Sequence, residues 1–325
     1  MDQSALITGA TGLLGRQVVK SFNDAGWKAV GTGFSRAGQA NILKVDIQDE
    51  VQVTKVLDEV KPQVIIHCAA DRQPDSCTQN PEGARRLNVQ ATATLASYAA
   101  AHSIFLVYIS TDYVFPGQPG QAPFKSTDKP QPTNIYGQTK LDGEQAVLDI
   151  SKPGQAVALR VPVLYGETDP KDNNKESAVN VLMDALWKSQ KGGEKVVMDD
   201  YAIRYPTNTS DVARVCVDIA KFYTSVTSAE PPSSKKPEDL PRILQFSSED
   251  RMTKYEIVQK FGEIMDLPLD GIEADRESGK KPGKDGTLRP YDCHLDTSDL
   301  TQLGIDVSTV DFVAWWRRWV GAYRH

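Results

Sequence analysis

Tyr136 and Lys140 stand four residues apart in the segment NIYGQTKLDGEQAV, residues 134–147, which is typical of a helix. Residues i and i+4 lie on one face of a helix, so both side chains can point into the same cleft. A phenol has a pKa of about 10 and is a poor acid-base catalyst at neutral pH unless a nearby ammonium stabilises the phenolate. The pair is therefore either a proton donor with its electrostatic support or the exposed face of an ordinary helix.

Two hydroxyl groups, Ser110 and Thr111, end the apolar segment that begins at Phe105. They would lie at the carboxyl end of a buried strand, the edge at which parallel α/β sheets bind ligands. A hydroxyl at this edge can polarise a substrate carbonyl. The Tyr-x-x-x-Lys spacing alone occurs by chance in many helices, so its interpretation depends on the surrounding elements.

A glycine-rich turn opens the chain in the segment ALITGATGLLGRQVV, between a predicted strand and a predicted amphipathic helix. Gly9 permits the tight turn, Gly12 lets the backbone approach a pyrophosphate, and Gly15 allows close packing of helix on strand. The helix N-terminus favours an anion. The turn therefore predicts a dinucleotide site, and the alternative is a purely structural turn.

The end of the second predicted strand indicates which dinucleotide binds. An acidic residue there would bind a ribose 2′-hydroxyl, but the segment contains Phe34, Ser35 and Arg36. A guanidinium suits a 2′-phosphate, so NADP is favoured over NAD, unless Arg36 is only a solvated surface cation. After the third strand, Asp46 could accept a hydrogen bond from the adenine amino group while Ile47 packs against the ring.

Strands and helices alternate through the first half of the chain, which predicts right-handed βαβ units and a parallel sheet covered on both faces. The fold class expected is α/β, a Rossmann-type doubly wound parallel sheet with a smaller C-terminal α/β substrate lobe. The predicted strands are residues 5–9, 29–34, 42–46, 64–69, 105–110 and 156–166, and the predicted helices are residues 13–25, 51–59, 81–101 and 134–147.

The second half of the chain changes in character and predicts a division into lobes. Helices are expected near residues 178–189 and over 207–223, the latter with Ser210 or Asp211 near its start. Pro, Ser and charged residues at 225–242 predict a flexible insertion. Residues 1–166, with 207–224 and 243–248, are expected to form the NADP-binding domain, and residues 167–206 and 249–325 the smaller lobe with a C-terminal tail.

Composition excludes several classes of protein. A formal net charge of -6 without a basic stripe argues against nucleic acid as a partner. No apolar run approaches the roughly 20 residues that span a bilayer, and a first strand at Ser4 leaves no room for a signal peptide, so a cytoplasmic protein is expected. The four cysteines form no CxxC pair and the four histidines stand far apart, so neither disulfides nor a metal site are expected.

The whole pattern resembles a known family. The segments TGATGLLG, HCAADRQPD, LNVQATATLA, YISTDYVFPG, IYGQTKLDGE and LRVPVLYGE are similar to the dTDP-4-dehydrorhamnose reductase branch of the extended short-chain dehydrogenase/reductases. The resemblance implies Thr111, Tyr136 and Lys140 as a catalytic triad that reduces a nucleotide-linked 4-keto sugar with NADPH. It also implies NADP contacts from Thr11, Gly12, Leu13, Leu14, Phe34, Ser35, Arg36, Asp46, Ile47, Cys68, Arg72, Tyr136, Lys140 and Leu164.

Within that branch, the segments ESAVNVLMD, RYPTNTSDVARVC and SEDRMTKYE resemble the β (regulatory) subunits of methionine adenosyltransferase. This resemblance implies an NADP-binding subunit that docks through its tail, residues 315–325, on the catalytic α subunit that makes S-adenosylmethionine. Trp, Tyr and Arg in the tail are typical interface anchors. The alternative is that Trp315, Trp316 and Trp319 pack on the body of the protein, and we expect these roles to be divided among them.

An active reductase is the alternative to a regulatory subunit. Both need the same pocket, but the reductases usually carry an RPxNS-like stretch where this chain has Arg289 to Cys293. Asp292 in this stretch would repel a sugar-nucleotide diphosphate, which weakens the reductase hypothesis. A dehydratase is not expected, because Asp112 is followed by Tyr113 where a Glu would be needed.

Overall fold

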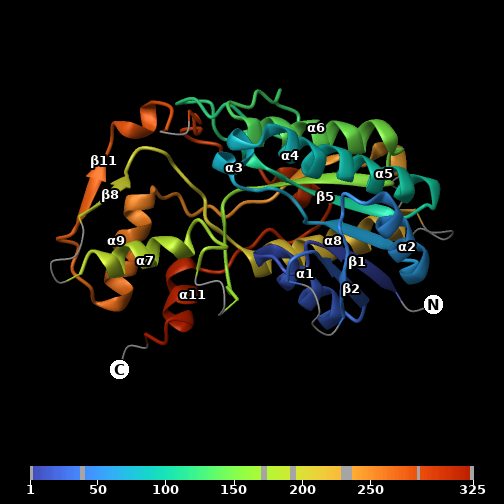
Figure 1. The fold of residues 1–325 in the computed structure, drawn as a ribbon, viewed down its shortest axis with the longest axis horizontal. Coiled ribbons are helices and arrows are strands. Elements are labelled where there is room, and N and C mark those ends of the chain that lie inside the picture. The colour runs from blue at the N-terminus through green and yellow to red at the C-terminus, as the bar shows by residue number, and fades with distance from the viewer. Residues whose placement is uncertain are drawn as a thin grey trace.

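The computed structural model describes residues 3–36, 41–169, 174–190, 195–227, 236–283 and 286–322. A seven-stranded sheet, parallel throughout, forms the centre of the larger part (Figure 1). Its order is β10-β6-β5-β4-β1-β2-β3 and therefore reverses between β1 and β4, which places a topological switch point there. The predicted Rossmann-type sheet is confirmed. Its strands are β1 (Ser4–Thr8), β2 (Lys28–Gly33), β3 (Ile42–Lys44), β4 (Val64–His67), β5 (Phe105–Thr111), β6 (Ala156–Val161) and β10 (Ile243–Gln245).

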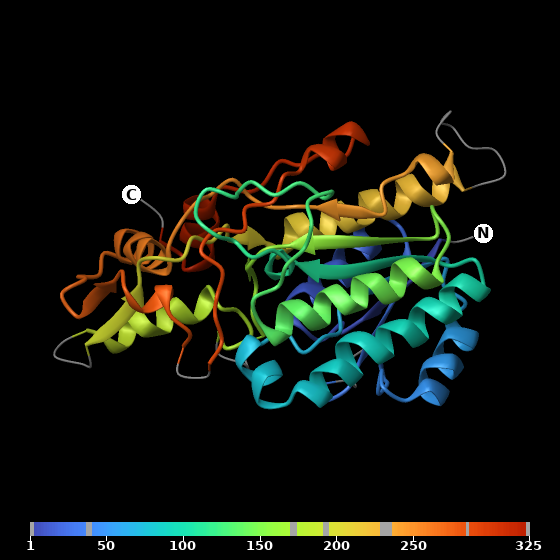
Figure 2. The same ribbon diagram turned by 90° about the horizontal axis from the view of Figure 1, so that it is seen from above.

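Helices cover both faces of this sheet (Figures 1 and 2). One face packs against α1 (Leu13–Asp24) and α8 (Thr209–Val226). The other face packs against α2 (Glu50–Val60), α5 (Ala91–Ala101) and α6 (Ile135–Ile150). The strands are therefore buried on both sides, which explains their nearly continuous apolar sequences.

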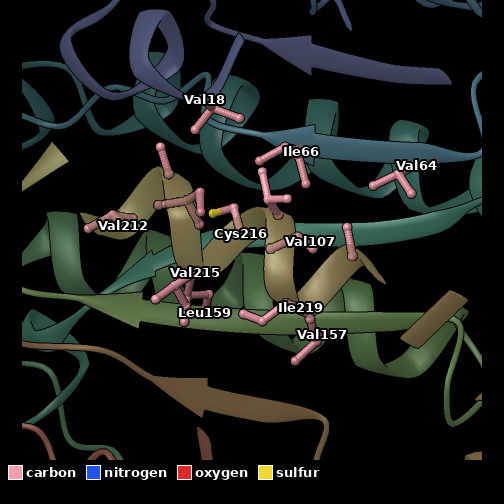
Figure 3. Close-up of a cluster of buried hydrophobic side chains, with 14 of the residues drawn as sticks. Val18, Val64, Ile66, Val107, Val157, Leu159, Val212, Val215, Cys216 and Ile219 are labelled. Carbon is pink, nitrogen blue, oxygen red and sulfur yellow. The ribbon is translucent and has the colours of Figure 1, made fainter. Parts of the chain in front are cut away.

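The two cores divide the residues of each strand by alternation. In β5, Phe105 and Val107 belong to the core beneath α1 and α8, while Leu106 and Tyr108 belong to the core beneath α2, α5 and α6. Successive strand residues point to opposite faces of a sheet. Figure 3 shows the first of these cores, in which residues of α8 such as Cys216 and Ile219 lie among side chains of β4, β5 and β6.

The helix predicted over residues 81–101 is wrong as a continuous α-helix. It consists of α4 (Pro81–Arg85), a π-helical turn (Arg86–Gln90) and α5, preceded by the unpredicted α3 (Pro74–Gln79). The wide turn buries Asn88, whose Nδ2 donates to the Asp71 carbonyl and to the Thr139 Oγ1, both at 3.0 Å. These contacts with distant residues account for the turn, and periodicity carries no sign of them.

The single strand predicted over residues 156–166 is also wrong. Pro162 follows β6 and has no backbone N–H to donate, so the ladder stops there. The chain resumes as β7 (Leu164–Tyr165), which pairs with β9 (Thr207–Asn208) in a separate two-stranded sheet. Helix α8 follows β9, with Ser210 and Asp211 in its first turn as expected, but its cap is Asn208, whose side chain accepts from the Ser210 N–H.

The remaining elements gather at one end of the sheet and form the smaller part seen in Figures 1 and 2. Phe261, Phe312 and Trp316 are among the side chains of its own buried core. The described ends of the 225–242 stretch are packed, since Leu240 is buried and Arg242 donates to the carbonyls of Leu148 and Ser151. Its residues 228–235 lie outside the described residues, so its flexibility stays a prediction. The elements of the smaller part are α7 (Asn180–Lys188), β8 (Val196–Asp199), α9 (Lys254–Met265), β11 (Ile272–Asp275), a 3-10 turn at Ser278–Lys280 and α11 (Phe312–Trp319). Helix α10 (Ser298–Gln302) and the 3-10 turns at Asp112–Val114 and Pro237–Asp239 lie elsewhere.

No helix in the described ranges has both the length and the apolar composition of a membrane span.

A buried ion pair joins the sheet to α6. The Arg160 guanidinium donates to both oxygens of Glu144, at 2.9 and 2.7 Å, and the two side chains are only 1% and 2% exposed. Ser110 donates a further hydrogen bond of 2.5 Å to the same carboxylate. Since removing one partner strands the other charge in a medium of low dielectric constant, the pair depends on both members.

We expect Glu144→Gln to lower the free energy of unfolding by about 3 kcal/mol, because Arg160 keeps its charge without a counterion. The measurement is urea denaturation at neutral pH. Glu273→Gln is the matched control, since Glu273 pairs with Lys195 in an exposed bridge whose side chains are 50% and 74% accessible. Its effect should stay below about 1 kcal/mol. Equal losses in the two variants would contradict the role assigned to the buried pair.

Candidate cofactor and catalytic site

The glycine turn between β1 and α1 packs directly against the chain that follows β4. Gly9 has a φ of 65°, and a Cβ there would lie 2.8 Å from the Ala69 nitrogen. A Cβ on Gly15 would lie 2.2 Å from the Gly9 carbonyl oxygen. Gly12 caps α1 without a side-chain hydrogen bond, so the first N–H groups of α1 remain available to a ligand. This backbone geometry fits a dinucleotide pyrophosphate.

The residues after β2 and β3 flank this turn. Thr11 contacts Gly33 closely, since a Cβ on Gly33 would meet the Thr11 side chain at 2.8 Å. Phe34 follows β2 and is 60% exposed, so its ring is accessible to a ligand. After β3, the Asp46 carboxylate accepts the N–H of Gln48 at 2.9 Å, and Ile47 is half-buried against the core beneath α2. Leu13 and Leu14 begin α1, and Ser35 is exposed beside Phe34.

Glu176 joins this site although the sequence reasoning missed it. Arg16 binds its carboxylate through two hydrogen bonds of 3.0 and 2.5 Å, and Arg36 donates to the same group. Burial alone would raise the pKa of the Glu176 carboxyl, but the hydrogen bonds from Arg16 and Arg36 outweigh it and lower the pKa to about 2. Glu176 lies 140 residues beyond Arg36 in the sequence, so local patterns could not reveal the contact.

Helix α6 brings Tyr136 to the end of β5. Asn134 caps the helix by accepting the Gly137 N–H at 2.9 Å. A Cβ on Gly137 would lie 2.2 Å from the Tyr113 carbonyl oxygen, so the first turn of α6 touches the backbone that follows Thr111. The rings of Tyr113 and Tyr136 meet edge to face, with centroids 6.0 Å apart. The absence of a side chain at Gly137 therefore permits the approach of Tyr136 to Thr111.

The electrostatics of this pair are set by burial. Burial raises the pKa of Tyr136, and interaction with the Thr111 side chain offsets part of the rise. Burial lowers the pKa of Lys140 to about 7, against an opposing effect from the Glu144 carboxylate. The Lys140 side chain is buried, and its ammonium lies 4.0 Å from the centroid of the Tyr108 ring of β5. Its support of a Tyr136 phenolate stays a prediction.

Three further predicted residues lie around these groups. Cys68 follows β4 next to the glycine turn, and its charge interaction with Lys140 shows that the two are neighbours. Arg72 interacts with the charges of Tyr136, Glu176 and Arg36, so it lies between the two halves of the site. Leu164 opens β7 and packs against the core beneath α1 and α8.

Asp112 and Arg204 are two more charged residues that the sequence reasoning gave no role in the site. Asp112 is 7% exposed and accepts a hydrogen bond of 3.0 Å from the Thr111 Oγ1. Burial raises the pKa of Asp112 to about 7, and the neighbouring Arg204 opposes this rise. Arg204 donates through Nη1 to two backbone carbonyls, while its buried Nη2 has no hydrogen-bond partner in the described part of the chain.

A cavity of about 460 Å³ lies on the side of the smaller part, and Ile203, the residue before Arg204, is part of its lining. Tyr201 and Tyr291 line it with ring centroids 4.7 Å apart. Asp292 faces elsewhere, since its carboxylate accepts the His294 N–H and lies 3.5 Å from the Tyr205 hydroxyl. The repulsion expected from Asp292 is therefore not directed into this cavity. Its lining consists of Asp200, Tyr201, Ile203, Arg251, Thr253, Glu256, Arg276, Glu277, Lys280 and Tyr291.

The sheet order and the glycine turn at its switch point define a Rossmann-type dinucleotide-binding protein. The family model described as the RmlD substrate binding domain matches residues 3–309. Methionine adenosyltransferase 2 subunit beta of Danio rerio is 40% identical over 307 residues, which cover 94% of this chain and 87% of that protein. The chain therefore belongs to the RmlD substrate-binding family, and within it to the group of methionine adenosyltransferase 2 beta subunits.

Solved structures share the fold. A dTDP-4-dehydrorhamnose reductase of Bacillus anthracis in complex with NADP has a TM-score of 0.78, at 21% identity over 98% of this chain and 99% of its own. A UDP-glucose 4-epimerase of Thermus thermophilus complexed with NAD has a TM-score of 0.74, at 18% identity over 97% of each chain. Both hold a nicotinamide dinucleotide, in agreement with the class of cofactor that the glycine turn fits.

The pKa of Asp112 predicts a distinctive pH dependence. Between its ordinary value of 3.8 and about 7, Asp112 is ionised in the unfolded chain but protonated in the folded one. The folded state then binds more protons, so the free energy of unfolding falls as the pH rises through this window. Asn does not titrate, so Asp112→Asn should gain about 2 kcal/mol relative to the unsubstituted protein between pH 5 and pH 8. Urea denaturation at both pH values measures this, and parallel profiles would contradict it.

Proposed function

We propose that this chain is an NADP-binding regulatory subunit that binds the catalytic subunit of methionine adenosyltransferase and modulates S-adenosylmethionine synthesis in the cytoplasm. The observation that carries the proposal is the 40% identity over 94% of the chain to a protein named as subunit beta of that enzyme. The glycine turn supports the binding of a dinucleotide cofactor, because the backbone contacts at Gly9 and Gly15 leave no room for a side chain.

A preference for NADP over NAD is supported by the arginine side chains near the glycine turn. Arg16, Arg36 and Arg72 gather around one carboxylate, that of Glu176. A guanidinium binds a phosphate through paired, charge-assisted hydrogen bonds. The group of three therefore offers more positive charge than a ribose 2′-hydroxyl requires, and we assign Arg36 to the 2′-phosphate.

The partner-facing part is proposed to begin in the last turn of α11. Trp316 is fully buried and Trp315 packs against Tyr165, so these two rings belong to the core of the smaller part. Trp319 is 42% exposed, although its ring stacks on Trp315. The inner face of the tail therefore packs on the body of the protein, and we assign the docking role to its outer end. Residues 323–325 lie outside the described residues.

A second candidate function is reduction of a nucleotide-linked 4-keto-6-deoxy sugar. It is favoured by the approach of Tyr136 to Thr111, since these groups could donate a proton and a hydrogen bond to a carbonyl oxygen. NADPH, when bound, supplies the hydride. Oxidation of NADPH in the presence of a dTDP-linked 4-keto sugar, lost in Tyr136→Phe, distinguishes this function from a purely regulatory one.

Arg36→Ala tests the choice of cofactor. We expect its Kd for NADP to rise on the order of 10-fold to 100-fold and its Kd for NAD to change little, because only NADP carries the 2′-phosphate. Isothermal titration calorimetry with each cofactor measures both constants. Arg85→Ala is the control, because Arg85 at the end of α4 forms a surface ion pair with Asp142 of α6. This substitution should leave both dissociation constants unchanged. Equal weakening of the two cofactors by Arg36→Ala would refute the assignment.

Removal of residues 319–325 tests the docking proposal. The truncated protein should no longer be retained by a purified methionine adenosyltransferase catalytic subunit in a pull-down, because the exposed end of α11 is lost. Its NADP affinity should persist, since Trp316 and the core around it remain. Trp187→Ala is the control, because Trp187 is a 54% exposed tryptophan on α7 of the same part. Retention of the truncated protein would rule out docking through this segment.

A further inference from the structure

The contact between Glu176 and Arg36 places a carboxylate where the second strand itself supplies none. Arg36 follows β2, the place from which Rossmann-type proteins contact the adenosine ribose. An acidic residue at this place hydrogen-bonds a ribose 2′-hydroxyl and repels a 2′-phosphate. Here the acidic group comes from the segment after β7 instead, and it accepts a hydrogen bond from the Arg36 guanidinium.

The position of Glu176 is fixed by its neighbours. The Ser177 Oγ donates to the Leu164 carbonyl at 2.8 Å, and the Asn180 Nδ2 donates to the Gly166 carbonyl at 2.9 Å. These bonds tie the start of α7 to the end of β7. The Glu176 side chain is only 6% exposed and also accepts the Asp169 N–H at 3.3 Å. The carboxylate is therefore part of the site and not a mobile surface charge.

The charge balance then decides between the two cofactors. Arg16 and Glu176 form a paired ion bridge, and Arg36 donates to the same carboxylate, so the guanidinium assigned to the 2′-phosphate is already bound to an acid. A phosphate monoester carries about two negative charges at neutral pH. It must share Arg36 with Glu176 and lie beside a carboxylate, whereas a 2′-hydroxyl can donate to that carboxylate without any repulsion.

We propose that Glu176 is a specificity-determining residue that competes with the 2′-phosphate of NADP for Arg36 and so holds the preference for NADP over NAD below what Arg36 alone would give. This inference rests on the proposed NADP site. It differs from a purely structural role, in which Glu176 only ties the start of α7 to the glycine turn. A structural tie affects stability and both cofactors together, while a competitor changes their ratio.

Glu176→Gln removes the charge and keeps the shape, and Arg16 stays bound to the carbonyls of Thr11 and Glu167. We expect the Kd for NADP to fall roughly tenfold, because one unit charge beside the phosphate is lost, and the Kd for NAD to stay the same or rise. Glu176→Ala should shift the ratio of the two constants in the same direction. Isothermal titration calorimetry with NADP and NAD on the full chain measures these constants.

Glu167→Gln is the matched control. Glu167 is an exposed acid on the same segment, and its carboxylate accepts from Gln17 at 3.3 Å. Its substitution should leave the ratio unchanged. A selective loss of NADP affinity in Glu176→Gln would overturn the inference and show that Glu176 supports Arg36. An equal change for both cofactors would also overturn it and show a purely structural role. Failure of the unsubstituted protein to bind NADP would instead refute the proposed cofactor, whatever the variants do.

Discussion

The close approach of the glycine turn to the chain after β4 is the constraint on which the site depends. Gly9 lies against Ala69, and Gly15 lies against Gly9, at distances that leave no room for a side chain at either glycine. These contacts hold β1, β4 and the start of α1 together at the point where the strand order reverses. The cradle for a dinucleotide is therefore built of backbone, and side chains only select what it holds.

A second close backbone contact, at Gly137, positions Tyr136. Gly137 lets the start of α6 touch the Tyr113 carbonyl, which brings Tyr136 to the end of β5. The same packing excludes water from the groups beneath it, so that burial moves the pKa values of Lys140 and Asp112 in opposite directions to about 7. A lysine and an aspartate with pKa values near neutrality can both exchange protons under physiological conditions. Burial thus brings the pKa values of both groups near neutrality.

Sequence patterns predicted the parts that local chemistry determines. The Gly9-to-Gly15 turn, the buried strands and the helix that carries Tyr136 each follow from residues close together in the chain. The misses have another origin. The π-helical turn depends on Asn88 meeting Asp71 and Thr139, and Glu176 contacts an arginine 140 residues away. No periodicity records such contacts. The break after β6 is different, because Pro162 is a local signal for it in the sequence.

The separation of the two proposed roles follows from which core each one uses. The glycine turn packs on β1 and β4, within the core beneath α1 and α8. Helix α11 contributes Phe312 and Trp316 to the other core, in the smaller part. Tyr165 lies directly after Leu164 and contacts Trp315 and Trp316, so the cofactor side and the tail side meet at β7. Because the inner face of α11 is needed for this packing, the proposed docking role is confined to its outer end, and we expect loss of that end to leave the fold intact.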